Sequence, residues 1–411
     1  MVADLHEGAV RRSALKMPHL PIYFDHHATT PLDGRVLEAM LPYLGAEFGN
    51  AGSTTHSFGW AAKAAVDEAR QQIAAALGAK PKEIVFTSGA TESNNLAIRG
   101  VAARYAEHSR HIVSASSEHP AVLDPLSRLR RQGFEVTLLG VIPAPDPLAG
   151  LVRPEDLSAA IRPDTILVSL MLANNEMGAI PPMARIGRIC KERGVLLHSD
   201  AAQAAGRIPL DVDALGVDLL SLSAHKMYGP KGVGALYVRS RGPRVRLEPL
   251  IDGGGQEGGL RSGTLNVAGI VGLARAVELC LEEMPRETPR LQALRDRLYA
   301  GLMATVPGVR LNGPALQQPG HRLPGNLNVS FDGVEGQAVI LQMKDVAAST
   351  GSACTSERPE PSHVLAALGL PDEAIRGSIR FGLGRFNTEE EVDWVVARAT
   401  EAVTRLRQMG T

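Results

Sequence analysis

Residues Val217 to Val238 read VDLLSLSAHKMYGPKGVGALYV, and the rest of the chain can be interpreted outward from this stretch. The apolar run from Leu219 to Leu222 predicts one buried strand, and the run from Val233 to Val238 predicts a second. The chain between them is too short for a helical crossover, so the second strand should enter antiparallel to the first. Lys226 therefore stands just past the end of a buried strand.

Lys226 is the first candidate for chemistry. Removing an ammonium group from water is costly, and burial lowers the pKa of a lysine. A partly neutral lysine can attack a carbonyl, so one hypothesis is a Schiff-base lysine that holds pyridoxal phosphate. The alternative is an ordinary surface lysine at a strand end, and this segment by itself is compatible with both.

Helix and strand patterns alternate along the preceding chain. Apolar residues at helical spacing predict helices from Trp60 to Leu77, capped by Gly78, and from Ala184 to Arg193. Long gaps between most of the strand candidates indicate crossover units, hence an α/β fold with a mostly parallel sheet covered on both faces and one antiparallel strand. The strand candidates before the antiparallel one are Ile84 to Phe86, Ile112 to Ala115, Val136 to Leu139, Ile166 to Leu170, Val195 to His198 and Leu219 to Leu222.

The pattern divides the chain into two domains. We predict a large domain over residues 32–284 and a smaller α+β domain made of residues 21–31 and 285–411. A helix-like run from Gly269 to Glu283 leads out of the large domain. Residues 1–20 are expected to form an N-terminal extension, because their basic residues are not followed by the apolar segment of a secretory signal.

Composition excludes several classes of protein. With 411 residues and 44% apolar content the chain can bury a large core. The net charge of −1 gives no electrostatic reason to expect nucleic acid or a membrane surface as partner, and no apolar run approaches the roughly 18 residues of a membrane span. Cys190, Cys280 and Cys354 cannot all pair and form no Cys-x-x-Cys motif. We therefore expect a cytoplasmic protein with neither disulfides nor a metal site.

Polar residues follow the predicted strands, at the sheet edge where ligands of open α/β sheets bind. The glycine turn in Thr87 to Asn94 can offer backbone N–H groups to a phosphate, although Thr91 could be an ordinary helix cap. His119 could stack on a cofactor ring or could be a hydrogen-bonded spectator. Asn175 suits a ring hydroxyl or a carboxylate, or simply a turn. Asp200 could keep a pyridine nitrogen protonated, which makes the ring an electron sink, or could cap a helix.

These motifs occur in a fixed order along the chain. They are Ser88-Gly-Ala-Thr-Glu-Ser93, Glu118-His119, Asn174-Asn-Glu176, Asp200-x-x-Gln203, Ser223-Ala-His-Lys226 and Arg261-Ser-Gly-Thr264. The set closely resembles the cysteine desulfurases of the class V aminotransferase group, and the resemblance extends from Tyr23 to Arg385. It implies the fold type I of pyridoxal-phosphate-dependent transferases.

The resemblance implies a role for each matching residue at the cofactor ring. Lys226 would hold pyridoxal 5′-phosphate as a Schiff base, and Asp200 would pair with its pyridinium nitrogen. His119 would stack on the ring and help to move protons. Gln203 and Asn175 would hydrogen-bond the ring oxygen or the substrate.

The resemblance also implies sites for the phosphate and for the substrate carboxylate. Arg380, a rigid two-pronged donor, matches the position that receives the carboxylate. The phosphate would be held by Ala90, Thr91, Ser223 and His225. Thr264 would reach the phosphate of the neighbouring subunit, which implies a homodimer with shared active sites.

Cys354 is the predicted sulfur acceptor. It lies in the run Ala348-Ser-Thr-Gly-Ser-Ala-Cys-Thr-Ser356, whose small polar residues indicate the flexible loop that a travelling thiolate needs. Cys190 and Cys280 lie in helical patterns beside apolar neighbours, which predicts core positions. The loop resembles that of the long-cysteine-loop group, which serves iron–sulfur cluster assembly and thiolation. Cys354 could also transiently ligate an iron–sulfur cluster.

The expected activity is therefore conversion of L-cysteine to L-alanine, with a persulfide on Cys354 that passes to an iron–sulfur scaffold or a sulfur-carrier protein. One alternative is another lyase or aminotransferase of the same fold, for example a selenocysteine lyase. A second is a sulfur donor for DNA phosphorothioation, which shares the chemistry and differs in its partner. A third, an inactive subunit, predicts loss of Lys226, His119 or Cys354, and all three are present.

Overall fold

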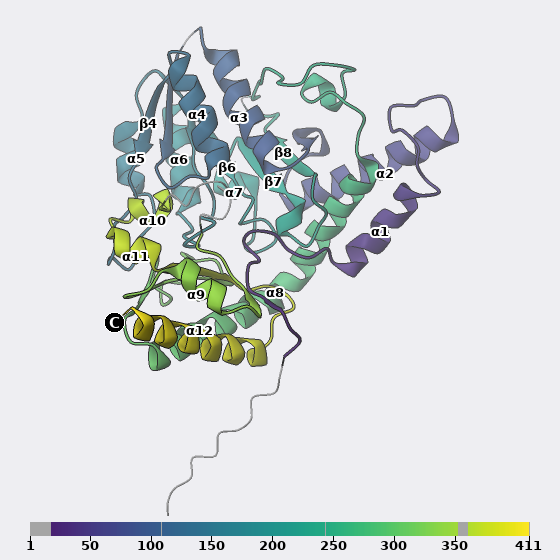
Figure 1. Cartoon of the computed structure of the whole chain (residues 1–411). Helices are drawn as coiled ribbons and strands as arrows, with labels where there is room; N and C mark the ends of the chain where they lie inside the picture. The colour runs from purple at the N-terminus through teal and green to yellow at the C-terminus, as the bar shows by residue number, and fades with distance from the viewer. Residues whose placement is uncertain (1–17, 108, 243, 352–360, 411) are drawn as a thin grey trace, which may run out of the picture.

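A mostly parallel sheet forms the centre of the larger part of the chain (Figure 1). The computed structural model describes residues 18–107, 109–242, 244–351 and 361–410. Within these ranges the sheet has seven strands in the order β2-β8-β7-β6-β5-β3-β4. The strands are β2 (Ile84–Thr87), β3 (His111–Ala115), β4 (Glu135–Leu139), β5 (Thr165–Ser169), β6 (Leu196–Asp200), β7 (Leu219–Ser223) and β8 (Gly234–Val238).

The pairing of the strands confirms the predicted topology. Strands β3 to β7 pair in parallel, whereas β8 is antiparallel to both of its neighbours, β7 and β2. The connection from β7 to β8 contains only a single 3₁₀ turn, Ala224–Lys226, so no helix carries the chain across the sheet. Each predicted strand lies within one or two residues of its observed bounds, and the largest difference is at the end of β6, which continues through the polar residues Ser199 and Asp200.

Helices cover both faces of this sheet. Alternate residues of β7 belong to different cores, Leu219 to the core beneath α3 and α4, and Leu220 to the core beneath α2, α6 and α8. The helices of this part are α1 (Gly34–Leu44), α2 (Ser57–Ala76), α3 (Ala90–Tyr105), α4 (Pro120–Arg131), α5 (Pro154–Ala160), α6 (Met183–Arg193), α7 (Val212–Leu215) and the first half of α8 (Val267–Thr305). The helices predicted from Trp60 and from Ala184 correspond to α2 and α6.

A second core lies around the C-terminal segments. Its elements are β1 (Ile22–Tyr23), β9 (Val309–Leu311), β10 (Asn326–Phe331), β11 (Val346–Ala347), β12 (Ser378–Gly382), α9 (Gly336–Gln342), α10 (His363–Ala367), α11 (Asp372–Arg376) and α12 (Glu389–Met409). Strand β1 pairs with β11, which supports the predicted placement of residues 21–31 beside the C-terminal part. The domain boundaries themselves stay a prediction.

Helix α8 joins the two cores. Its residues up to Cys280 pack in the core of the large sheet, and Leu294, Leu298 and Leu302 pack in the second core. The helix continues through Pro285 and Pro289, so the predicted boundary at 284/285 falls inside it. Neither α8 nor any other helix of the described segments is apolar enough over a sufficient length to cross a membrane.

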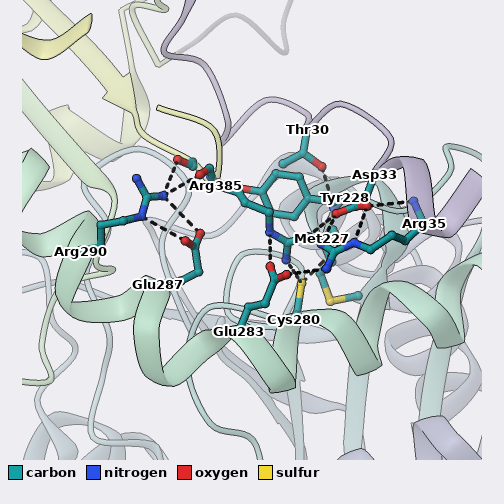
Figure 2. A network of polar contacts seen from close by, with 11 residues as sticks. Thr30, Asp33, Arg35, Met227, Tyr228, Cys280, Glu283, Glu287, Arg290 and Arg385 are labelled. Atoms are coloured by element: carbon teal, nitrogen blue, oxygen red, sulfur yellow. Dashed lines mark hydrogen bonds and ion pairs between the residues drawn. The ribbon is translucent and has the colours of Figure 1, made fainter. Parts of the chain in front are cut away.

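An ion-pair network fastens the C-terminal part to α1 and α8 (Figure 2). Arg385, which follows β12, donates through Nη1 to Asp33 Oδ2 at 2.6 Å, and its Nε lies 2.7 Å from Glu283 Oε2. Arg35 contacts the same two carboxylates at 2.7 Å each. Asp33 is 4% exposed and Arg385 is 8% exposed at their side chains. The network therefore links three segments, with Asp33, Glu283 and Arg385 largely removed from water and Arg35 half-exposed.

Asp33→Asn should lower the thermal midpoint of unfolding at neutral pH, by the equivalent of about 3 kcal/mol, because it breaks a buried ion pair. Hydrogen bonds from Arg35, and then from Arg385, hold the pKa of Asp33 well below its usual range. A carboxyl with a lowered folded-state pKa stabilises the protein above its unfolded pKa, near 4, and loses that contribution as the pH falls further. Midpoints measured across this range should therefore converge for the two proteins at acid pH.

The matched control is Asp67→Asn, which breaks an exposed pair with Lys63 on α2. Exposed pairs contribute about 0–1 kcal/mol, so this midpoint should hardly move. An equal effect of the two substitutions would show that the network around Asp33 has no special role in stability.

Candidate active site

A cavity of about 550 Å³ opens at the carboxyl ends of β6 and β7. Nine of the site residues predicted from the sequence line this cavity. They come from segments between residues 90 and 226, which the fold brings together. These nine are Ala90, Thr91, His119, Asn175, Asp200, Gln203, Ser223, His225 and Lys226. The cavity is therefore the candidate active site.

Lys226 and Asp200 meet because their strands are neighbours. Asp200 is the last residue of β6, and Lys226 ends the 3₁₀ turn that follows β7. The two strands pair in parallel, with Asp200 opposite Ser221. Their carboxyl ends consequently lie at the same edge of the sheet, and both side chains reach the cavity.

Two hydrogen bonds fix the carboxylate of Asp200. Its Oδ1 accepts from the backbone N–H of Ala202 at 2.8 Å, and its Oδ2 accepts from Asn94 Nδ2 at 2.6 Å. Asp200 is 7% exposed and Asn94 is fully buried. With both oxygens held in this way, the carboxylate faces the cavity in a defined orientation and can accept a further N–H from a ligand.

Asn94 is a site residue that the sequence analysis did not single out. It lies one helical turn after Ala90 on α3, so the i, i+4 spacing from the start of the helix was the available signal. Its Oδ1 is buried and has no partner among the described residues. Glu118, which the sequence analysis named only within the motif Glu118-His119, is buried and is not among the residues that line the cavity. Its Oε1 accepts from the backbone N–H of Met171 at 2.8 Å, and burial raises its pKa well above the ordinary value.

His119 lies at the N-terminus of α4 with a defined tautomer. Its Nδ1 accepts from the backbone N–H of Ala121 at 3.0 Å, so in the neutral ring the proton is on Nε2. Burial, and next the positive charge of Lys226, lower the pKa of His119. The imidazole is therefore neutral near pH 7 and can accept a proton only by giving up the cap or exchanging the Nε2 proton.

The turn before α3 forms a cradle for an anion. Gly89 precedes the helix with φ of +149°, and the N-terminal N–H groups of the helix begin at Ala90. Gly234 of β8 allows this turn to pack closely, because a Cβ there would lie 2.6 Å from the Cα of Gly89. Ser223 and His225 line the same part of the cavity, and His225 Nδ1 lies 3.1 Å from Thr29 Oγ1.

Arg380 lies behind Asn175 and is not among the residues that line the cavity. Its Nη1 donates to the backbone carbonyl of Asn175 at 2.9 Å, and its Nη2 donates to Asp25 Oδ1 at 2.8 Å. The side-chain Oδ1 of Asn175 and the Nε of Arg380 are buried without partners within the described ranges. These contacts position Asn175, and the predicted role of Arg380 toward a substrate carboxylate stays a prediction.

The remaining predicted residues lie apart from the cavity or outside the described segments. Thr264 is exposed in the loop before α8, and its predicted contact with a neighbouring subunit stays a prediction. Cys354 lies outside the described residues. Cys190 and Cys280 are 1% and 3% exposed, as predicted for core cysteines, and burial raises the pKa of each thiol to about 12 and about 11.

Comparison with known proteins agrees with this geometry. Residues 22–395 match the model of the aminotransferase class-V family. A cysteine desulfurase IscS of Anaeromyxobacter dehalogenans is 57% identical over 390 residues, which cover 95% of this chain and 94% of that protein. The chain belongs to the cysteine desulfurases of the class V aminotransferase family. The resemblance read from the ordered motifs is thereby confirmed.

Solved structures of this family share the fold. A NifS-like protein superposes with a TM-score of 0.85 at 39% identity, over 93% of this chain and 99% of the other. A structure described as SspA in complex with cysteine gives a TM-score of 0.77 at 38% identity, over 89% of this chain and all of the other. The predicted fold type I, with its mixed sheet and mostly parallel strands, is confirmed.

Proposed function

We propose that the cavity binds pyridoxal 5′-phosphate and converts L-cysteine to L-alanine, and that the sulfur leaves as a persulfide on Cys354. The observation that carries this proposal is the meeting of Lys226, Asp200 and His119 at one sheet edge, in a chain whose relatives are cysteine desulfurases. L-cysteine as the substrate is supported by the complex with cysteine of a protein 38% identical to this chain.

The residues of the cavity fit the cofactor. The backbone N–H groups at the start of α3, together with Ser223 and His225, suit a phosphate. Asp200 suits a protonated ring nitrogen. Gln203 donates one N–H of its Nε2 to the carbonyl of His27, and the other N–H suits the ring oxygen. The unpartnered Oδ1 of Asn175 is the kind of orphaned buried acceptor that a ligand satisfies. When bound, pyridoxal phosphate supplies an electron sink for charge that forms on the α-carbon of an amino acid.

The side chains of this chain would then divide the work. Lys226 supplies the amine that binds the cofactor covalently and that takes up or returns a proton once it is displaced. Asp200 keeps a positive charge on the ring side of the cavity through electrostatic attraction. His119 is neutral and is oriented by the hydrogen bond from Ala121, and it would accept a proton at Nδ1 when this bond opens.

His119 predicts the acid limb of the pH profile. Because burial and Lys226 lower its pKa below 6.5, the imidazole stays neutral over a wider range toward acid pH, and it protonates only below that value. We expect kcat/KM to fall only below about pH 6.5 as His119 protonates. His119→Asn keeps an acceptor for the cap of α4, and it should lower kcat/KM about 100-fold and remove this limb. An unchanged acid limb in that variant would assign the titration to another group.

The finer parts of the proposal concern partners. We propose that Cys354 passes its persulfide to an iron–sulfur scaffold or a sulfur-carrier protein in the cytoplasm, and that two chains form a homodimer in which Thr264 completes the phosphate site of the neighbour. The charge balance of the chain supports a protein rather than a nucleic acid as the acceptor.

A labelling experiment tests the proposal. The protein loaded with pyridoxal phosphate is incubated with ³⁵S-labelled L-cysteine, and alanine, free sulfide and label on alkylated peptides are measured. We expect alanine and bound label in equal amounts in the first turnover, with the label on the peptide that contains Cys354. Alanine without labelled peptide would indicate a lyase that releases the sulfur as S(0) without a persulfide on Cys354, and absence of alanine would refute the desulfurase assignment. Transfer of the label is then followed to added scaffold and carrier proteins.

A further inference from the structure

Arg207 is a cation at the back of the active site with neutral partners. It follows β6 in the turn that also contains Gln203, and burial lowers its pKa to about 10, which leaves it charged at neutral pH. Its guanidinium contacts Gln203 Oε1, His27 Nδ1 at 2.9 Å, the carbonyl of His26 at 2.6 Å and the carbonyl of Lys226 at 3.4 Å. Within the described segments no carboxylate forms an ion pair with it.

The contact with Gln203 fixes how this amide is turned. Arg207 has only donors, so the atom that faces it must be the Oε1 of Gln203. The Nε2 of Gln203 then donates one N–H to the carbonyl of His27 at 2.8 Å. The second N–H of Nε2 is left for an acceptor in the cavity, which Gln203 lines. A turned amide would place N–H groups against N–H groups and present an oxygen to the ligand.

The neighbouring histidine fits the same arrangement. Because Arg207 donates to Nδ1 of His27, the ring is neutral with its proton on Nε2. Burial, and then the charge of Arg207, hold the pKa of His27 well below its ordinary value, so this ring adds no second charge. Arg207 is therefore the source of positive charge at this wall, and its link to the carbonyl of Lys226 brings it close to the lysine.

We propose that Arg207 is a positioning residue, which orients Gln203 as a donor to the ring oxygen of the cofactor and provides the positive charge that stabilises this oxygen as an anion. The inference rests on the proposed function, because it requires pyridoxal phosphate in the cavity. A negatively charged ring oxygen is stabilised by a hydrogen-bond donor that has a cation next to it, as oxyanions are in other active sites. The same charge also opposes protonation of the nitrogen of Lys226 when it is bound to the cofactor.

The test measures cofactor binding and a titration, and does not depend on turnover. Arg207→Gln removes the charge and keeps N–H donors, whereas Arg207→Lys keeps the charge. For Arg207→Gln we expect the dissociation constant of pyridoxal phosphate to rise about tenfold. We also expect the pH midpoint of the visible absorption band to rise by about one unit, since a nearby cation no longer opposes protonation of the bound nitrogen. Arg207→Lys should restore the midpoint to that of the parent protein.

Arg322 supplies the matched control. It is also buried, and among the described residues it donates to neutral groups, namely the carbonyls of Pro314 and Asn312 and the side chain of Asn326. Arg322→Gln should lower stability to a comparable extent and leave both the dissociation constant and the midpoint unchanged. All these proteins share the same charged and titratable groups along the cavity, which are Glu92, His119, Asp200, His225, Lys226 and Lys231.

The outcomes separate the inference from the proposed function. If the parent protein shows no visible band with pyridoxal phosphate, the proposed function fails and the inference fails with it. If the band is present but Arg207→Gln binds and titrates like the parent, or Arg322→Gln shifts the midpoint equally, the inference alone is overturned. Should Arg207→Gln not fold, Gln203→Leu decides, since a dissociation constant of pyridoxal phosphate equal to that of the parent would contradict action through Gln203.

Discussion

Lys226→Ala should abolish the visible absorption that pyridoxal phosphate acquires on binding, and it should lower alanine formation at least about 10⁴-fold. The substitution removes the side-chain amine that is proposed to bind the cofactor covalently and to shuttle a proton at the substrate. The residue ends the turn after β7, and its backbone carbonyl is held by Arg207 at 3.4 Å, so the loop should keep its conformation without the side chain. Absorbance and alanine are both measured on protein that has been incubated with excess cofactor.

Lys231 provides a control within the same loop. It also lines the cavity but is exposed, and it lies beyond the 3₁₀ turn that places Lys226. Lys231→Ala should therefore keep the visible band and most of the activity, because a solvated ammonium contributes only screened electrostatic attraction. If the band survives in Lys226→Ala, or disappears in Lys231→Ala, the assignment of the covalent bond to Lys226 is wrong.

The sequence predicted most of this site because the fold brings strand ends together. Asp200 and Lys226 directly follow buried apolar runs, and parallel neighbours necessarily present their carboxyl ends at one edge. The short connection between β7 and β8 likewise allowed only an antiparallel strand. In each case a local pattern was enough, since the sheet topology follows from the order and spacing of the runs.

Local sequence patterns could not predict residues whose role depends on partners from distant segments of the chain. Asn94 bonds Asp200 across 106 positions of sequence, and its spacing from the start of α3 does not reveal that this partner lies at the end of β6. Arg207 matters because it joins Gln203 to residues 26–27 and to Lys226, which only the folded chain brings together. The contacts of Arg380 with Asn175 and Asp25 likewise join distant segments, and its predicted role at the substrate carboxylate stays a prediction.

Asp200→Asn should lower alanine formation about 10³-fold while the cofactor still binds through Lys226. The carboxylate is expected to favour the positively charged pyridine nitrogen, and an amide of the same shape supplies no such charge. The substitution can be accommodated, because the new Oδ1 can accept from the N–H of Ala202. The new Nδ2 can donate to Asn94 once that amide turns, since Asn94 Oδ1 has no partner among the described residues.

This compatibility makes the comparison informative. The thermal midpoint of Asp200→Asn should stay near that of the parent, and the visible band should persist with a lower affinity for the cofactor, so a loss of rate would reflect missing charge and not a damaged fold. Asn94→Ala serves as the counterpart, because it keeps the carboxylate and removes only one of its two donors. We expect about a tenfold loss of rate there, the cost of a single hydrogen bond to a charged group. If Asp200→Asn instead formed alanine at the parental rate, the pyridine nitrogen would need no carboxylate, and stabilisation of the α-carbon would have to come from another residue of the cavity.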